Sequence, residues 1–218
     1  MTASAETRLR RKIIETCLAM NRLGINQGVA GNVSARHGDG ILITPSGLAY
    51  DSMKPSDIVF LDRDGRSHGS RKPSSEWRFH YDILREREDA GAVLHAHSTC
   101  CTALACLGRE IPAFHYMVAV AGGDSIRCAP YATFGSQELS DNALAALKDR
   151  KACLLANHGM ICIGRDLDSV LTLALEVETL ARQYCQALQL GEPVILPDAE
   201  MQRVLEKFKT YGKQDPER

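Results

Sequence analysis

The segment Val93-Leu94-His95-Ala96-His97 constrains the fold of this chain more than any other. An apolar run of this kind predicts a β-strand, and in a strand residues i and i+2 point to the same face. His95 and His97 therefore project side by side, where both imidazoles can reach one metal ion. The alternative is a pair of partly buried strand histidines bonded to the backbone, since a His-x-His pair alone is only moderately specific.

A third histidine strengthens the metal interpretation. His158 lies in a second apolar run, residues 152–159. Three neutral imidazoles with an open fourth position are typical of a catalytic, rather than a structural, divalent-metal site. The sequence therefore predicts a metal centre built from His95, His97 and His158.

The composition indicates an ordinary globular domain and argues against several classes of protein. The 218 residues are 44% hydrophobic and 24% charged and contain no repeat or linker, which favours a single domain over 1–218. A formal net charge of −1 argues against a protein dominated by nucleic-acid or acidic-membrane binding. No run of about 18 apolar residues is present, so we expect no membrane span. The eight cysteines form no Cys-x-x-Cys pair and the N-terminus has no signal-peptide pattern, so we expect reduced thiols in the cytoplasm.

The periodicity of apolar residues predicts an α/β domain. Apolar runs bounded by turn residues predict strands at 28–35, 41–43, 58–61 and 92–97 and on both sides of 157–159. Helical spacing and start signals predict helices at 7–23, 73–88, 98–107, 136–148, 166–190 and 198–209. The second of these helices would begin with a hydroxyl cap at Ser74-Ser75. Adjacent strands near the N-terminus argue against a purely parallel sheet, so we expect a mixed central sheet flanked by helices.

Three short segments favour anion binding. They are Gly31-Asn32, where glycine allows close backbone approach; Ser46-Gly47, in a turn; and Ser74-Ser75, at a helix N-terminus. Each has a local explanation as a bulge, a turn or a cap. Beside a metal centre, the three together suggest a small phosphorylated substrate.

Glu76 directly follows the serine pair. Its ordinary role would be a first-turn glutamate that complements the helix dipole. Near a metal ion it could instead be a fourth ligand or a general base, since a neighbouring cation and burial tune the pKa of a carboxylate.

Taken as a set, these motifs resemble the class II aldolase/adducin family, and within it the aldolases that cleave L-fuculose 1-phosphate. The resemblance covers nearly the whole chain. It is carried by residues 28–34, 73–80, 95–97, 111–117, 121–123, 130–135, 157–159 and 206–212.

The resemblance implies a three-layer α/β/α fold around a mixed, largely antiparallel sheet, with a mobile tail from about residue 207. It implies zinc held by His95, His97 and His158, with Glu76 completing the resting site; cobalt or manganese could substitute. It also implies a four-fold ring of subunits, in which Tyr116 reaches the neighbouring subunit's site. The phosphate of the substrate would be held at Asn32, Ser46, Gly47, Ser74 and Ser75. Phe134 and Tyr211 would lie near the aldehyde end.

The implied reaction is reversible cleavage of a ketose 1-phosphate to dihydroxyacetone phosphate and an aldehyde such as L-lactaldehyde. Glu76 would move the C3 proton and Tyr116 the proton on the C4 oxygen. Other activities in the family stay open: an aldolase for 5-methylthioribulose 1-phosphate or 5-deoxyribulose 1-phosphate, a pentulose-phosphate 4-epimerase, and a dehydratase. A non-enzymatic adducin-like scaffold is the remaining alternative, and the complete histidine triad argues against it.

Overall fold

The strand that carries the histidine pair lies in the interior of the sheet. In the computed structural model, which describes residues 4–210, β5 (Ala92–Ala96) pairs antiparallel with β1 (Asn32–His37) and with β8 (Gly159–Gly164). All five of its residues are buried. Because a strand alternates its faces, Leu94 and Ala96 point to one side of the sheet, while Val93 points to the other.

Within the described residues, one sheet of eight strands runs in the order β4-β3-β2-β1-β5-β8-β7-β6. Every neighbouring pair is antiparallel except β6 and β7, which are parallel. This confirms the predicted mixed, largely antiparallel sheet. The other strands are β2 (Gly40–Ile43), β3 (Val59–Leu61), β4 (Ser67–His68), β6 (Cys128–Ala129) and β7 (Ala152–Leu155).

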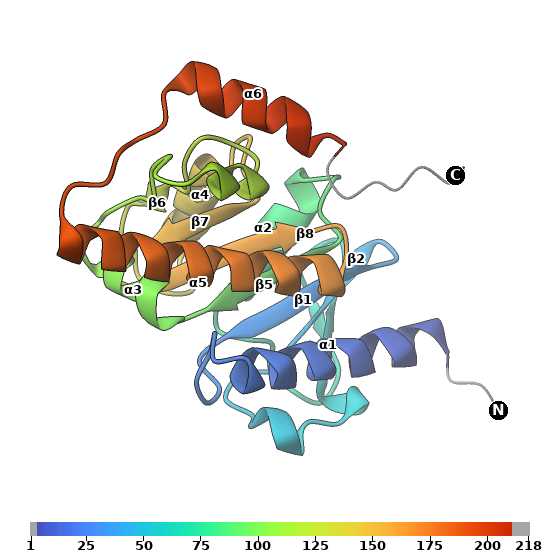
Figure 1. Ribbon diagram of the computed structural model, residues 1–218. Helices are drawn as coiled ribbons and strands as arrows, with labels where there is room; N and C mark the ends of the chain where they lie inside the picture. The colour runs from blue at the N-terminus through green and yellow to red at the C-terminus, as the bar shows by residue number, and fades with distance from the viewer. Residues whose placement is uncertain (1–3, 211–218) are drawn as a thin grey trace, which may run out of the picture.

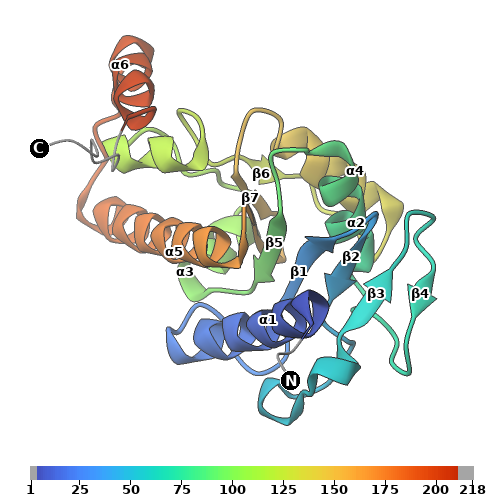
Figure 2. The same ribbon diagram turned by 90° about the vertical axis from the view of Figure 1, so that its right-hand side faces the viewer.

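Helices cover both faces of the sheet and make three layers (Figures 1 and 2). One face is covered by α1 (Ala5–Arg22), α3 (Thr99–Cys106) and α5 (Leu167–Leu190). The opposite face is covered by α2 (Trp77–Glu86) and α4 (Gln137–Ala146). A last helix, α6 (Asp198–Phe208), packs on the 3-10 helix η3 (Tyr116–Ala121); two shorter 3-10 helices are η1 (Tyr50–Ser52) and η2 (Pro55–Asp57).

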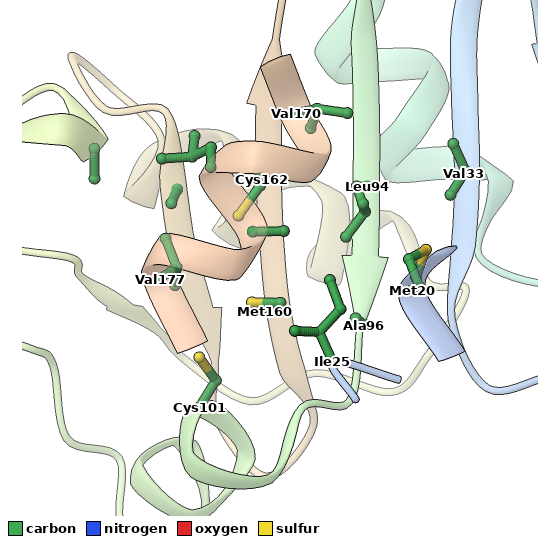
Figure 3. Close-up of a cluster of buried hydrophobic side chains, with 14 of the residues drawn as sticks. Met20, Ile25, Val33, Leu94, Ala96, Cys101, Met160, Cys162, Val170 and Val177 are labelled. Atoms are coloured by element: carbon green, nitrogen blue, oxygen red, sulfur yellow. The ribbon is translucent and has the colours of Figure 1, made fainter. Parts of the chain in front are cut away.

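The larger of two buried apolar clusters fills the space between the sheet and α5. Figure 3 shows Leu94 and Ala96 of β5 beside Met160 and Cys162 of β8, with Val177 of α5 packed over them. Burial on this scale is the main favourable contribution to folding. The same cluster joins β5 and β8, the strands on either side of the histidines, to the helix above them. No helix among residues 4–210 is long and apolar enough to cross a bilayer.

The predicted helices and strands are present, and two boundaries differ from the prediction. The glycine-containing segment 28–31 precedes β1, which begins at Asn32. The helix α2 begins at Trp77 with Glu76 as its N-cap and has no side-chain cap, so the predicted hydroxyl cap is wrong. Pro73 forms an isolated bridge with Pro45, and a turn at Ser75 and Glu76 separates this bridge from the helix, so the Ser74 hydroxyl accepts from the amide of Glu76 at 3.3 Å before the helix begins.

The predicted mobile tail, from about residue 207, lies mostly outside the described residues. Residue 207 lies inside α6, which continues to Phe208. Tyr211 and the rest of the predicted mobile tail lie outside the described residues, so that prediction stays open.

Candidate metal centre

The three histidines converge where β5 meets the hairpin of β7 and β8. His95 lies in β5, His97 follows its last residue, and His158 lies in the turn between β7 and β8. The Nε2 atoms of His95 and His97 are 3.0 Å apart. The ring centroids of the three imidazoles lie 4.7 to 4.9 Å from one another. The predicted side-by-side arrangement of the triad is therefore present.

Glu76 reaches this cluster from the N-terminus of α2. Its Oε2 lies 3.2 Å from His95 Nε2, and its Oε1 lies 3.0 Å from His158 Nε2. One potential ligand atom from each of the four residues lies within 4.8 Å of the others. Three imidazoles and a carboxylate thus surround a single point.

The hydrogen bonding around the cluster fits a bound cation. His95 Nδ1 lies 2.9 Å from the backbone oxygen of Met160, which can only accept, so Nδ1 carries the proton and the Nε2 lone pair faces the cluster. Glu76 is 5% exposed, and its Oε1 has no hydrogen-bond partner. A buried carboxylate oxygen without a donor is costly. A metal ion at the centre would satisfy both the carboxylate and the lone pairs.

The charge states of the cluster also suit metal binding. Burial raises the pKa of Glu76, but the adjacent imidazoles of His95 and His158 reverse this and hold that pKa well below its ordinary range. Burial, together with His95 and His158, lowers the pKa of His97 to about 4. At neutral pH Glu76 is therefore ionised and His97 is neutral, which are the forms that bind a cation.

The anion-favouring segments lie next to Glu76. Asn32 is the register partner of His95 in the sheet, and its Nδ2 donates to Glu76 Oε2 at 2.9 Å. The turn that contains Ser46 runs beside the segment that contains Ser74. Two backbone hydrogen bonds join these segments: Ser46 N donates to Lys72 O at 3.1 Å, and Ser74 N donates to Thr44 O at 2.9 Å. Asn32 is thus bonded to Glu76, and the Ser46 turn is bonded to the segment that leads into Glu76.

Individual residues of these segments differ in exposure and use. Ser74 is buried, whereas Ser75, Ser46 and Gly47 are exposed. Gly47 has a φ of +66°, which requires the left-handed conformation that glycine adopts without strain. The amide of Ser46 is already bonded, so a bound anion would use the remaining donors of this turn.

The close backbone approach expected at Gly31 is present, and it is an approach to a neighbouring strand. A Cβ at this position would lie 2.7 Å from the backbone oxygen of His95 and 2.7 Å from Asn26 Oδ1. Glycine here lets β1 approach β5 closely. Its predicted contact with phosphate stays a prediction.

The residues predicted for the aldehyde side occupy different places. Phe134 is 65% exposed, and its loop lies against the serine pair, since a Cβ on Gly135 would be 2.6 Å from Ser75 O. Tyr116 is half exposed on η3 and stacks on His115 with ring centroids 4.9 Å apart. Among the described residues, no hydrogen bond or ring contact joins Tyr116 to the histidine cluster.

One further residue belongs to this site and was not predicted from the sequence. His80 lies one helical turn after Glu76 and is fully buried. Its Nε2 is 2.5 Å from Asn32 Oδ1, and its Nδ1 is 2.7 Å from Ser34 Oγ. The available signal was its spacing of four residues from Glu76, which puts both side chains on one helix face.

Comparisons with known proteins agree on one family. Residues 11–185 match the model described as "Class II Aldolase and Adducin N-terminal domain". A Rhodospirillum rubrum protein named 5-methylthioribulose-1-phosphate/5-deoxyribulose-1-phosphate aldolase is 62% identical over 204 residues, 94% of this chain and 92% of the relative. The L-fuculose phosphate aldolase of Escherichia coli strain K12 is 55% identical over 206 residues, 94% of this chain and 96% of the relative. A solved structure of an L-fuculose 1-phosphate aldolase is 42% identical and superposes with a TM-score of 0.90, covering 95% of this chain and 98% of that one.

Proposed function

This chain belongs to the class II aldolase and adducin family, and from that premise we propose that it is a zinc-dependent aldolase. The proposed reaction is the reversible cleavage of a ketose 1-phosphate to dihydroxyacetone phosphate and an aldehyde. The observation that carries the proposal is the convergence of His95, His97, His158 and Glu76 on one point, with Asn32 bonded to Glu76. A purely scaffolding protein has no use for such a costly buried cluster.

His95, His97 and His158 would hold the metal, with Glu76 as the resting fourth ligand. Zinc suits three imidazoles and a carboxylate, and cobalt or manganese could take its place. When bound, the ion would act as a Lewis acid toward the carbonyl oxygen at C2 of the substrate.

Glu76 is proposed to move the proton at C3. Its Oε1 is buried and lacks a hydrogen-bond donor, so it is available to accept a proton from a substrate placed at the cluster. The phosphate would be held by Gly31, Asn32, Ser46, Gly47, Ser74 and Ser75, and this would position the sugar for cleavage.

The aldehyde end of the site is proposed to be completed by a second subunit. Tyr116 is exposed and makes no described contact with the metal cluster of its own chain, which supports a role at the neighbouring subunit of a homotetramer. There its hydroxyl would exchange the proton on the C4 oxygen. Phe134 and Tyr211 would lie along the aldehyde.

The names of the relatives support two candidate specificities. The first is L-fuculose 1-phosphate, which the sequence motifs favour: relatives at 55% identity are named L-fuculose phosphate aldolase, and a solved structure is named L-fuculose 1-phosphate aldolase. The relative at 62% identity is named for 5-methylthioribulose 1-phosphate and 5-deoxyribulose 1-phosphate. We rank 5-methylthioribulose 1-phosphate and 5-deoxyribulose 1-phosphate first, because the relative named for them has the higher identity. All three ketoses share the phosphorylated end and differ at the aldehyde end, so the same metal and phosphate contacts serve each of them. We also propose a cytoplasmic location, which the eight free thiols support.

A panel of ketose 1-phosphates tests the proposal. The metal-loaded protein is offered L-fuculose 1-phosphate, 5-methylthioribulose 1-phosphate and 5-deoxyribulose 1-phosphate, and dihydroxyacetone phosphate is measured. We expect release from at least one substrate, fastest from 5-methylthioribulose 1-phosphate and 5-deoxyribulose 1-phosphate, and none from a His158→Ala control. An epimerised product or a diketone, with no dihydroxyacetone phosphate, would identify a different activity of the same family.

A further inference from the structure

We propose that His80 is a positioning residue: it fixes the amide of Asn32 so that the Nδ2 group faces Glu76 and the substrate phosphate. The inference rests on the proposed function. It concerns a side chain that touches neither the metal cluster nor any exposed surface. His80 is 0% exposed and lies between α2 and β1.

The hydrogen bonds of Asn32 determine which way its amide points. Glu76 Oε2 can only accept, so the Asn32 atom 2.9 Å away must be Nδ2. The other amide atom, Oδ1, therefore faces His80 Nε2 at 2.5 Å. Since Oδ1 can only accept, His80 Nε2 carries the hydrogen.

The second ring nitrogen completes the chain of bonds. With the hydrogen on Nε2, His80 Nδ1 is an acceptor, and Ser34 Oγ donates to it at 2.7 Å. Asn32 and Ser34 are two residues apart on β1, so both point to the face that α2 covers. The chain Ser34–His80–Asn32–Glu76 is thus a run of four buried groups with a single direction of donation.

His80 is suited to this task because it stays uncharged. Burial lowers the pKa of His80 to about 3, so its ring is neutral at neutral pH. The ring is also held in place by stacking on Phe79, with centroids 4.7 Å apart. An Asn amide can rotate by half a turn with little change of shape. A protonated Glu76 no longer requires a donor from Asn32, so His80, a fixed donor to Oδ1, then keeps the amide in place.

Two amide variants that differ in length separate the two bonds of His80. Glutamine at position 80 places its amide where Nε2 of the ring lies and can still donate to Asn32, whereas asparagine reaches only the position of Nδ1 and the Ser34 contact. His80→Gln should therefore retain most of the affinity for dihydroxyacetone phosphate, measured by calorimetry on the metal-loaded full-length protein. His80→Asn should bind it roughly 10-fold to 100-fold more weakly, as expected when a hydrogen bond to a charged group is misdirected. Equal metal content and equal melting temperatures would show that both variants are folded.

A double mutant tests whether His80 acts through Asn32. In an Asn32→Leu background, the further change His80→Asn should cause no additional loss of dihydroxyacetone phosphate binding. Losses that multiply, or equal affinities of His80→Gln and His80→Asn, would overturn the proposal.

The tautomer of His80 supplies a readout that does not depend on activity. In ¹⁵N-histidine-labelled protein, the His80 signals, assigned by their loss in His80→Gln, should be those of a neutral ring protonated at Nε2. A ring protonated at Nδ1 would overturn the inference even if the protein cleaves ketose 1-phosphates. A wild-type protein with the Nε2 tautomer that binds no dihydroxyacetone phosphate would instead refute the proposed function and leave the direction of the Asn32 amide established.

Discussion

Glu76 combines three roles at a single position. It is the N-cap of α2, it lies within 3.2 Å of two imidazoles, and it accepts a hydrogen bond from Asn32. The helix N-terminus and the imidazoles favour its ionised form, while burial disfavours it. A carboxylate held between such opposing effects is a suitable group for moving a proton.

The substitution Glu76→Gln isolates the proton-transfer role. Glutamine has nearly the same shape and keeps an oxygen beside the histidines, so we expect most of the metal to be retained. Turnover should fall by about 10²-fold to 10⁴-fold, the usual contribution of a general base. Elemental analysis and steady-state kinetics measure the two quantities. Glu86→Gln, an exposed change at the other end of α2, is the control, and an unchanged turnover in Glu76→Gln would remove this residue from the chemistry.

At the scale of elements, the hairpin of β7 and β8 presents His158. Its turn is tight: Asn157 has a φ of +54°, and a Cβ on Gly159 would lie 2.5 Å from Ala96 O and 2.9 Å from His97 Cδ2. Asparagine tolerates the left-handed conformation better than most residues, and glycine leaves room for β5. The hairpin therefore places His158 against the end of β5 by close backbone packing.

Gly159→Ala should disturb the metal centre through this packing. The added methyl group must displace β5 or the turn, so we expect a loss of about 1 to 3 kcal/mol in the free energy of unfolding. Because His97 and His158 move apart, metal affinity should fall roughly 10-fold to 100-fold.

Gly164→Ala is the matched control at the other end of β8, where a Cβ would lie 2.6 Å from Val170 N. That variant should lose stability yet bind metal normally. Equal metal affinities in the two variants, by competition with a chelator, would contradict the prediction.

A second element, the hairpin of β3 and β4, should show a pH-dependent stability. Asp62 Oδ2 bonds His68 Nε2 at 2.7 Å, and Oδ1 accepts from the amides of Asp64 and Arg66 at 2.9 Å each. The bond to His68, followed by the Arg66 amide, lowers the pKa of Asp62 from 3.8 to about 2.

The direction of this shift sets the pH window. A folded-state pKa below the unfolded value means that Asp62 stabilises the protein fully above pH 3.8 and loses this contribution as the pH falls toward 2. The free energy of unfolding of the wild type and of Asp62→Asn is measured by urea unfolding at several pH values. The difference between the two proteins should be largest above pH 3.8 and should vanish near pH 2. Asp39→Asn, in the exposed turn between β1 and β2, is the control. A difference that is constant with pH would exclude the linkage.

At the scale of the whole molecule, the location of Tyr116 favours an active site that is shared between two subunits. It lies on η3, beside the groove that also contains Phe114, Leu196 and Phe208, and among the described residues no contact links it to the metal cluster. If the neighbouring subunit receives this side chain, each site combines the metal ligands of one chain with the tyrosine of another.

Mixed oligomers test the shared site. Tyr116→Phe and His95→Ala chains, inactive separately, should regain up to about one quarter of wild-type activity when refolded together, since random mixing unites an intact metal site with an intact tyrosine in that share of sites. A mixture of His95→Ala and His97→Ala should recover nothing, because both changes affect the ligands of one chain. Failure of the first mixture, with mixed oligomers verified by mass spectrometry, would refute a shared site.

The features that the sequence determined by itself are those with a local cause. The spacing of His95 and His97 places them on one strand face because a strand repeats every two residues. The turn around His158 and the long helix from Asp166 follow from equally local signals, and the structure has both. These features depend on backbone geometry, which a few neighbouring residues specify.

The tertiary structure decided which distant segments meet. The bridge of Pro45 to Pro73 is followed by a turn at Ser75 and Glu76, in place of the hydroxyl cap expected at Ser74 and Ser75. The position of His80 between Asn32 and Ser34 depends on α2 packing across β1, which is 46 to 48 residues away in the sequence. Such contacts depend on the sheet order β1-β5-β8, which buries apolar residues from distant parts of the sequence together, and a local sequence pattern does not specify that order.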